Sequence, residues 1–267
     1  MESDPVITLT TDFGSKDPFV GIMKGVILTI NPAAKIIDIT HEISPQNILE
    51  ASYAIHASYE YFPHRTIHIV VVDPGVGSSR RPLLISVGHY YFVGPDNGIF
   101  SRIYETEETA EVIHVNATHY FLSQESTTFH GRDIFAPVGA WLSKGISISK
   151  FGDPVEDYVS IPSPVPVIYG DKSIEGEVMY VDRFGNLITT ISDQNIKNMS
   201  RSSPDKNIKV TVNSMEIPMK NFYAESSDEG LCAIINSFGH LELFVNRGNA
   251  SMNYNIAVGD KVNVYVI

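Results

Sequence analysis

The spacing of apolar residues changes near residue 165, and this change constrains the fold more than any other feature of the chain. Before it, runs of β-branched residues such as 66–73 (TIHIVVVD) alternate with segments whose apolar residues recur every three or four positions. This alternation predicts an α/β domain with a mainly parallel sheet and Rossmann-like helix layers. After it, short strand-like segments follow one another without a convincing helix, which predicts a small antiparallel β-barrel.

Four prolines between residues 154 and 166 separate these two patterns and have the composition of a linker. We therefore expect an α/β domain over residues 1–165 and an all-β barrel domain over residues 166–267. Within the first domain, residues 82–98 (PLLISVGHYYFVGPDNG) predict a hairpin followed by a turn.

Helix-start signals place three helices in the first domain. Asp17 is positioned to cap one helix, with Pro18 at its first position, and Ser44 opens a second. A third is expected from about Asp133, because Pro137 is tolerated only near a first turn.

Composition excludes several classes of protein. The formal net charge of −12 argues against nucleic acid and anionic membrane as partners, since phosphate contacts need clustered Lys and Arg. No apolar run reaches 18 residues, and the acidic N-terminus does not have the pattern of a signal peptide. The single cysteine, Cys232, excludes an intrachain disulfide and is expected to be a buried apolar residue. We expect a cytoplasmic protein.

Two acids follow predicted parallel strands of the first domain. Asp12 comes after residues 6–11 and Asp73 after residues 66–72, so both are expected at the carboxyl edge of the sheet, where open α/β sheets bind ligands. Each could instead cap a turn. Arg80 and Arg81 follow Asp73 by seven and eight residues, and one guanidinium could fold back to hold its carboxylate in orientation.

His130 lies between an aromatic residue and a glycine (TTFHGRD), just before the predicted third helix, where a catalytic role and a structural role are both open. Asp12, Asp73, His130 and Asp133 form an oxygen-rich set that a metal ion could use, but no recurring metal-binding spacing supports it.

In the second domain, residues 182–186 (DRFGN) and 237–249 (SFGHLELFVNRGN) combine aromatic and polar residues near glycines. Phe184, Asn186, Phe238 and Arg247 are candidates for ligand binding, although ordinary hairpin turns explain the same pattern.

Six motifs in order, TLTTDFG, VVDPGVGSSRR, GPDNG, FHGRDIFAP, VDRFGNLITTI and FVNRG, together resemble the S-adenosyl-L-methionine (SAM) hydrolases, also called SAM hydroxide adenosyltransferases. The SAM-dependent fluorinase and chlorinase are relatives of that family. The resemblance implies a metal-independent enzyme that attacks C5′ of SAM with water and forms adenosine and L-methionine. It needs no cofactor, because SAM is the substrate. It also implies a homotrimer, with each site between the first domain of one subunit and the barrel of the next.

Carried over by motif, the resemblance assigns catalysis to Asp73, Arg80 and His130 and places Asp12 at the ribose hydroxyls. It places Phe129 and Gly131 beside the nucleoside. The remaining substrate-binding assignments fall in the barrel domain, namely Asp182, Phe184, Asn186, Phe238, Glu242, Asn246 and Arg247.

Two positions favour water over halide as the nucleophile. The fluorinating relatives carry a tyrosine in place of Asp73 and a hydroxyl three residues on, where this chain has Val76. Gln46 stands where those relatives have an aromatic side chain. The alternatives are a halogenase on the same scaffold, a non-catalytic adenosine or SAM binding protein, and a metal-dependent nucleotide hydrolase. Which of Asp73 and His130 takes the proton of water is left open.

Overall fold

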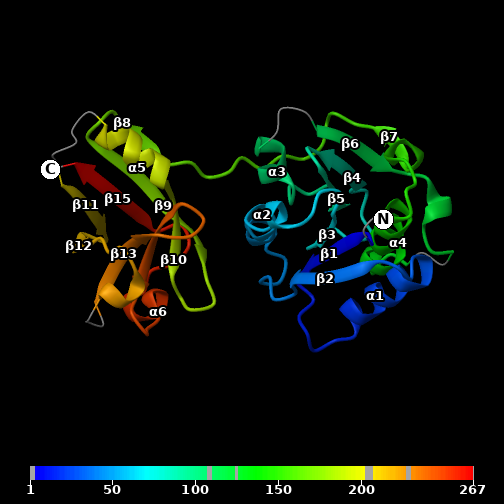
Figure 1. Cartoon of the computed structure of the whole chain (residues 1–267), viewed down its shortest axis with the longest axis horizontal. Helices are drawn as coiled ribbons and strands as arrows, with labels where there is room; N and C mark the ends of the chain where they lie inside the picture. The colour runs from blue at the N-terminus through cyan, green and yellow to red at the C-terminus, as the bar shows by residue number, and fades with distance from the viewer. Residues whose placement is uncertain (1–3, 107–109, 124–125, 202–206, 227–229, 267) are drawn as a thin grey trace. The chain divides into compact units, whose positions relative to one another are not determined.

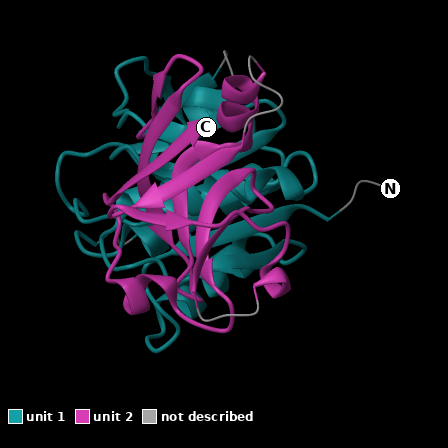
Figure 2. Cartoon of the chain, turned by 90° about the vertical axis from the view of Figure 1, so that its left-hand side faces the viewer, with its two compact units in different colours: residues 1–163 teal, residues 164–267 magenta. Residues whose placement is uncertain are grey.

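The computed structural model of the chain describes residues 4–106, 110–123, 126–201, 207–226 and 230–266. Its internal contacts divide the chain into two compact units, unit 1 (Met1–Ser163) and unit 2 (Pro164–Ile267), which Figure 2 colours separately. The sequence places the boundary at 165/166, in the same proline-rich segment.

The described strands of unit 1 form one sheet in the order β2-β1-β3-β5-β4-β6-β7 (Figure 1). Strands β2, β1, β3 and β5 are parallel to one another, β4 and β7 run in the opposite direction, and β6 runs with the first four. A mixed, mostly parallel sheet is confirmed, whereas the Rossmann-like layering stays a prediction. The strands are β1 (Val6–Thr11), β2 (Lys35–Thr40), β3 (Ile67–Val71), β4 (Pro82–Val87), β5 (Tyr90–Pro95), β6 (Ala110–Val115) and β7 (Gly152–Pro154).

Helices cover both faces of this sheet. Buried residues of α1 and α4 belong to the cluster on one face, and those of α2 and α3 to the cluster on the other. The α-helices are α1 (Phe19–Ile30), α2 (Ile48–His56), α3 (Ser101–Thr106) and α4 (Ala136–Ser143). Short turns of other helix types are η1 (Tyr59–Tyr61), η2 (Thr118–Tyr120) and η4 (Ile148–Lys150), all 3₁₀, and the π-helical turn η3 (Gly131–Phe135).

Two of the predicted helix starts are wrong in detail. Pro18 is the residue before α1 rather than its first residue, and no side chain caps that helix. Helix α2 begins three residues later than Ser44–Pro45 suggests, because the Asn47 side chain accepts a hydrogen bond from the backbone N–H of Glu50. Pro137 does lie in the first turn of α4, as expected.

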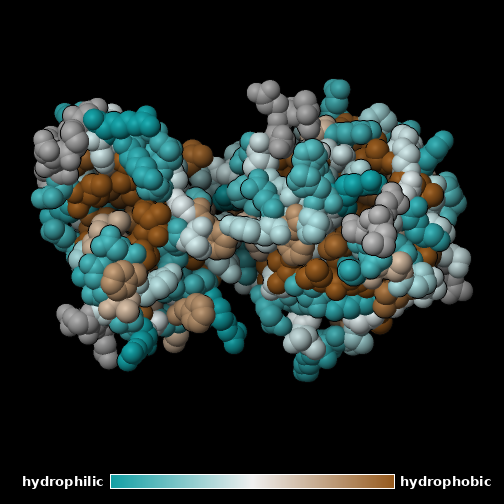
Figure 3. All heavy atoms as spheres, in the orientation of Figure 1, coloured by the Kyte–Doolittle hydropathy of each residue, from teal (hydrophilic) through white to brown (hydrophobic). Residues whose placement is uncertain are grey.

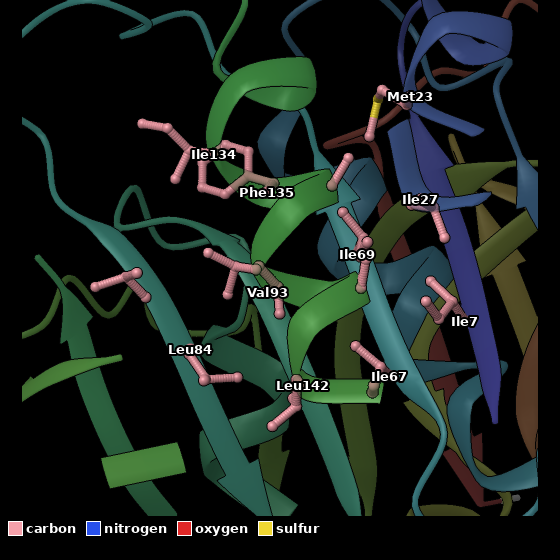
Figure 4. Packing of buried hydrophobic residues seen from close by; sticks show 14 of the residues in the cluster. Ile7, Met23, Ile27, Ile67, Ile69, Leu84, Val93, Ile134, Phe135 and Leu142 are labelled. Carbon is pink, nitrogen blue, oxygen red and sulfur yellow. The ribbon is translucent and has the colours of Figure 1, made fainter. Parts of the chain in front are cut away.

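The core of unit 1 forms where α1 and α4 pack on the central strands. Figure 4 shows Ile67 and Ile69 of β3 near side chains from the neighbouring strands and from both helices. Gly139 permits this approach, because a Cβ atom there would lie 2.6 Å from Cδ1 of Ile69. The central strand is therefore buried along its whole length, as a near-continuous apolar run predicts.

Unit 2 is an antiparallel, nearly closed barrel. Its strands follow the order β12-β11-β15-β9-β10-β14-β13, β8 also pairs with β9, and a bridge between Met219 and Ala233 joins the region after β12 to β13. The strands are β8 (Val167–Tyr169), β9 (Ser173–Val181), β10 (Leu187–Ser192), β11 (Ile208–Val212), β12 (Met215–Ile217), β13 (Leu231–Ile235), β14 (His240–Val245) and β15 (Lys261–Val266).

The expectation that the second domain lacks helices is wrong. Helix α5 (Asp193–Ser200) starts from a capping box, in which Ser192 accepts from the backbone of Asn195 and the Asn195 side chain accepts in return. Helix α6 (Ala250–Tyr254) and the 3₁₀ turn η5 (Tyr223–Glu225) are shorter. Cys232 is buried beside Ile234 and Phe244, as expected.

Hydrophobic side chains also reach the surface of unit 1. Figure 3 shows them among hydrophilic residues over the region where Figure 1 places β2. Exposed apolar residues of α1 and β2 are Phe19, Ile22, Leu28 and Ile37. Within the described ranges, none of the helices combines the length and the apolar character needed to cross a bilayer.

Candidate active site

The candidate site of unit 1 lies at the carboxyl edge of its parallel strands. Asp12 follows β1, Asp73 follows β3 by two residues, and Asp96 and Asn97 follow β5 directly. Because β1, β3 and β5 are adjacent and parallel, these polar residues share one edge of the sheet.

Asp73 and Arg80 form a bidentate ion pair across the loop that joins β3 to β4. Nε of Arg80 lies 2.9 Å from Oδ1 and 3.0 Å from Oδ2 of Asp73, and Nη2 of Arg80 also donates to Oδ2. The two side chains are only 5% and 8% exposed. Such a pair fixes the plane of the carboxylate as well as its position. The sequence-based prediction that one arginine folds back onto Asp73 is correct, and that arginine is Arg80.

His130 joins this pair from a different loop. Its Nδ1 lies 2.6 Å from Nη2 of Arg80, and the residue is 8% exposed. A guanidinium can only donate hydrogen bonds, so Nδ1 must be the acceptor, and Nε2 carries the ring proton of the neutral imidazole. Arg80 therefore sets both the orientation of the imidazole and its tautomer.

One nitrogen of the Arg80 guanidinium takes no part in these hydrogen bonds. Nη1 of Arg80 is buried and has no hydrogen-bond partner among the described residues. The guanidinium carbon lies 5.3 Å from the centre of the Phe135 ring, in the range of a cation–π contact. A buried donor without a partner is costly, which makes Nη1 the natural place for a water molecule or a ligand oxygen.

Gly77 brings the two loops together. Its φ is +78°, and a Cβ atom there would lie 2.2 Å from the carbonyl oxygen of Thr127, three residues before His130. Only glycine allows both the left-handed backbone and this close approach. Glycine in the segment after Asp73 thus has a packing role as well as a turn role.

Asp12 is held by the backbone beyond β2. Its Oδ2 accepts a hydrogen bond of 2.8 Å from the N–H of Gln46, a residue with φ +65°. Phe129 packs edge to face against Phe13 and Phe19, with ring centres 5.9 and 5.3 Å away. A Cβ atom at Gly131 would lie 3.1 Å from the Phe129 ring, so Gly131 lets that ring lie against the helix start.

In unit 2, Asp182 is first of all a turn residue. Its Oδ1 accepts from the backbone N–H groups of Phe184 and Asn186, at 2.9 and 2.8 Å. The Asn186 side chain donates to Oδ2 at 3.2 Å, and Asn186 is buried. This arrangement holds Phe184 at the tip of the β9–β10 hairpin, where it is 72% exposed.

Glu242 is buried in the middle of β14, with both oxygens occupied. It accepts from the hydroxyl of Tyr223 at 2.8 Å and from the amide of Asn236 at 3.1 Å. Burial raises the pKa of Glu242, and nearby Asp182 raises it further, although the two hydrogen bonds oppose this. Tyr223 and Asn236 were not predicted from the sequence, because only the folded strands bring them to Glu242.

The remaining predicted residues of unit 2 do not gather in one place. Phe238 lies in the turn before β14, whereas the turn of Phe184 lies beside the far end of that strand, near Asn249. Asn246 donates to the Ser226 carbonyl at 2.6 Å, and Arg247 is exposed with φ +58°. A single barrel therefore does not place the Phe184 and Phe238 rings side by side.

Comparison with known proteins matches each of the two units to a family model. Residues 7–152 match the model of the SAM hydroxide adenosyltransferase N-terminal domain, and residues 176–263 match that of the C-terminal domain. The chain belongs to the SAM hydroxide adenosyltransferase family. The two matched regions lie in units 1 and 2 respectively.

Relatives in this family extend over nearly the whole chain. It is 35% identical to the (R)-S-adenosyl-L-methionine hydrolase of Methanocaldococcus jannaschii, over 97% of this chain and 95% of the relative. It is 32% identical to the enzyme of the same name from Thermus thermophilus, over 92% and 93%. A fluorinase from Actinopolyspora mzabensis is more distant, at 23% identity over 98% and 97%. A crystal structure of an uncharacterized conserved protein from Thermotoga maritima superposes with a TM-score of 0.89 at 36% identity, covering 97% of this chain and 99% of that one.

Asp133, the fourth residue of the possible metal set, is occupied elsewhere in this family member. Its carboxylate accepts from Arg132 at 2.5 Å and from the Ser126 N–H at 2.8 Å. Burial alone would raise the pKa of Asp133, but these partners outweigh it and lower that pKa. In the part of the chain that the structure describes, no three His, Cys, Asp or Glu side chains converge as metal ligands.

Proposed function

We propose that this chain hydrolyses SAM to adenosine and L-methionine by attack of water on C5′, with no metal ion or cofactor. The observation that carries the proposal is the buried cluster of Asp73, Arg80 and His130, assembled from two loops at the sheet edge. Relatives named (R)-S-adenosyl-L-methionine hydrolase, at 30–35% identity over almost the full length, support it.

The chemistry needs little more than an oriented water molecule. The oxygen of water forms a bond to C5′ while the C5′–S bond breaks. The electron pair of the C5′–S bond stays with sulfur as methionine leaves. Sulfur passes from a sulfonium to a neutral thioether, so no developing negative charge on the leaving group needs stabilising. The nucleophile is the difficulty, and a positioned general base typically contributes about 10²–10⁴-fold.

The hydrogen bonds of the cluster favour Asp73 as the proton acceptor. Nδ1 of His130 already accepts from Arg80, and its Nε2 carries a proton, so the imidazole has no open lone pair. The Asp73 carboxylate retains acceptor capacity beyond its bonds to Arg80. In this proposal Asp73 takes the proton of water, while the imidazole N–H and Nη1 of Arg80 are donors that orient oxygen.

The remaining site residues are assigned by the family pattern. Asp12, fixed by Gln46, would accept hydrogen bonds from the ribose hydroxyls, and Phe129 would border the nucleoside. The exposed rings of Phe184 and Phe238 suit a role in a neighbouring subunit's site. We therefore include a homotrimer with shared sites in the proposal, and a cytoplasmic location stays a prediction.

The test is an isosteric change of the acceptor. Asp73→Asn keeps the shape of the side chain but removes its charge and most of its basicity, and we expect turnover to fall by about 10²–10⁴-fold. Adenosine and methionine are measured by chromatography after incubation with (S)- and (R)-SAM, and adenosine binding by calorimetry. Normal turnover in a folded Asp73→Asn variant would remove Asp73 from the mechanism.

The same assay separates the competing functions. A halogenase would give a 5′-chloro nucleoside when chloride is added, and a binding protein would retain SAM without releasing methionine. A metal-dependent hydrolase would lose activity with a chelator. Light scattering tests the trimer, which predicts a mass near three times 29.5 kDa.

A further inference from the structure

The loop that carries Asp73 and Arg80 is anchored at both ends. It leaves the sheet after β3 and returns at β4. Apart from the Asp73–Arg80 pair, its backbone is held by turn contacts, such as the N–H of Val76 to the carbonyl of Asp73 at 3.2 Å and that of Ser78 to the carbonyl of Gly75 at 3.0 Å. The bidentate pair needs its two members at a fixed separation. Residues outside the loop must therefore set where its ends lie.

Asn97 holds the first end. Its Nδ2 donates to the carbonyl oxygen of Val72 at 2.9 Å, and its Oδ1 accepts from the N–H of Ile99 at 3.2 Å. Val72 is the residue immediately before Asp73. The pairing of β3 with β5 stops at Ile69, so the Asn97 side chain supplies a bond where the sheet no longer does.

Asp96 holds the second end. Its backbone N–H donates to the carbonyl of Arg81 at 2.9 Å, and its Oδ2 accepts from Nε of Arg81 at 2.8 Å. The other oxygen accepts from the N–H of Val159 at 2.7 Å, and Asp96 is only 7% exposed. Arg81 is the residue immediately after Arg80. Asp96 and Asn97, consecutive residues of one turn, thus bind the backbone immediately after Arg80 and immediately before Asp73.

We infer that Asp96 and Asn97 are positioning residues for hydrolysis, which set the separation and direction of Asp73 and Arg80 without touching substrate. This inference rests on the proposed function. Its physical basis is that catalytic groups must hold their geometry closely, since a displacement of about 1 Å can lower turnover about 10²-fold. It also explains why adjacent arginines point to different partners, with Arg80 in the cluster and Arg81 in its anchor.

The test uses two variants of Asn97. Asn97→Leu matches the shape and removes both hydrogen bonds, and Asn97→Asp places an acceptor against the Val72 carbonyl. We expect kcat for SAM to fall about 10²-fold in both, with an unchanged Kd for adenosine. A protonated aspartic acid can donate to the carbonyl, so the activity of Asn97→Asp relative to the parent should rise as pH falls. That ratio should stay flat for Asn97→Leu.

Asn31 provides the matched control. It is buried, whereas Asn97 is half-buried, and its side chain also makes two hydrogen bonds. Its Nδ2 donates to Oγ of Ser143 at 2.8 Å, and its Oδ1 accepts from the N–H of Ala33 at 3.2 Å. It lies between α1 and β2, at the opposite edge of the sheet from Asp73. Asn31→Leu should lower stability while leaving kcat within twofold, which separates a general loss of stability from a loss of positioning.

A second readout is independent of turnover. The Nε–H of Arg80 is held between the two oxygens of Asp73, so its NMR signal should be shifted and slow to exchange in the parent and in Asn31→Leu. Arg80→Lys assigns that signal by removing it. In Asn97→Leu the signal should move or broaden.

The two hypotheses fail in different ways. A parent protein that makes no adenosine from SAM contradicts the proposed function, and the NMR signal then decides the positioning role alone. An unchanged Arg80 signal in Asn97→Leu, or a kcat within twofold of the parent, overturns the inference. Should the leucine variant not fold, Asn97→Asp, with its pH-dependent ratio and its own Arg80 signal, decides it.

Discussion

His68 should make unit 1 sensitive to mild acid. It lies on the central strand β3, with Nδ1 2.7 Å from Oγ1 of Thr8, and its ring stacks on Phe92 with centres 5.1 Å apart. Its Nε2 is buried without a hydrogen-bond partner among the described residues. Protonation would bury a charge and a second N–H with no acceptor. Burial accordingly lowers the pKa of His68 from 6.5 to about 3.

The sign and size of the effect follow from linkage. The folded pKa lies below the unfolded value, so between pH 6.5 and 3 the unfolded chain binds more protons and stability falls as pH falls. Above pH 6.5 the contribution is complete. At pH 5 the unfolded state gains about 1.5 pH units of protonation free energy, which removes about 2 kcal/mol at 1.36 kcal/mol per unit.

The assay is urea unfolding at pH 7.5 and pH 5, at one protein concentration. The only tryptophan, Trp141, lies in α4, so its fluorescence reports on unit 1. Carboxylates contribute to any acid response, so the measured quantity is the difference between the parent and the double variant Thr8→Val with His68→Phe, which keeps the ring stack. The parent should lose about 2 kcal/mol more than this variant between the two pH values.

A surface histidine provides the control. His89 is exposed, and His89→Gln should keep the pH response of the parent. Equal acid losses in the parent and in the double variant would refute the reasoning, because they would mean that His68 accepts a proton without penalty or that unfolding exposes no new site for one.

Two further predictions concern a glycine of the catalytic loop and the cap of a helix. Gly77→Ala should lower kcat at least tenfold, because its Cβ would collide with the Thr127 carbonyl and separate the two catalytic loops. The left-handed backbone should also lower the free energy of unfolding by about 1–2 kcal/mol. The control is Gly145→Ala, with φ +87° and open space around it, which should lose stability but keep its kcat; equal kinetics in the two variants would contradict the prediction. Ser192→Ala should lower the stability of unit 2 by about 1 kcal/mol, because it removes the capping box of α5; circular dichroism in urea measures this loss. The control is Ser200→Ala, which loses only a hydrogen bond within α5 and should lose less stability. A larger loss in Ser200→Ala than in Ser192→Ala would show that the cap is not what stabilises the helix.

The sequence predicts best what depends on local pattern. The buried strand β3 follows from its run of apolar residues, and the β4–β5 hairpin follows from two such runs with a glycine between β4 and β5. Helix boundaries were less accurate, because the side chain that caps is chosen by the fold, as Asn47 is over Ser44. Helix α5 was missed because its apolar face consists of two buried residues, Ile196 and Met199, within an otherwise polar segment.

Contacts of the candidate site within one loop were also easier to predict than contacts between distant segments. Asp73 and the adjacent Arg80 and Arg81 lie at the two ends of one loop, so spacing predicts that an arginine contacts Asp73, and the family resemblance selects Arg80. The bonds of Tyr223 to Glu242 and of Asn97 to Val72 join residues 19 and 25 positions apart. Such contacts depend on strand register, which one sequence does not specify, although the GPDNG motif did mark a turn there.

The π-helical turn ahead of α4 has a consequence for how this gene can change. In that turn the N–H of Ala136 reaches back to the carbonyl of Gly131, one residue further than in an α-helix. Loss of a single codon between Gly131 and Phe135 would let the helix become regular and keep its packing on the sheet. The residues immediately before the deletion would then be turned by about 100° relative to α4, and the His130 imidazole would point away from Arg80. Evolution can exchange side chains in this turn, but it cannot shorten it without losing the cluster.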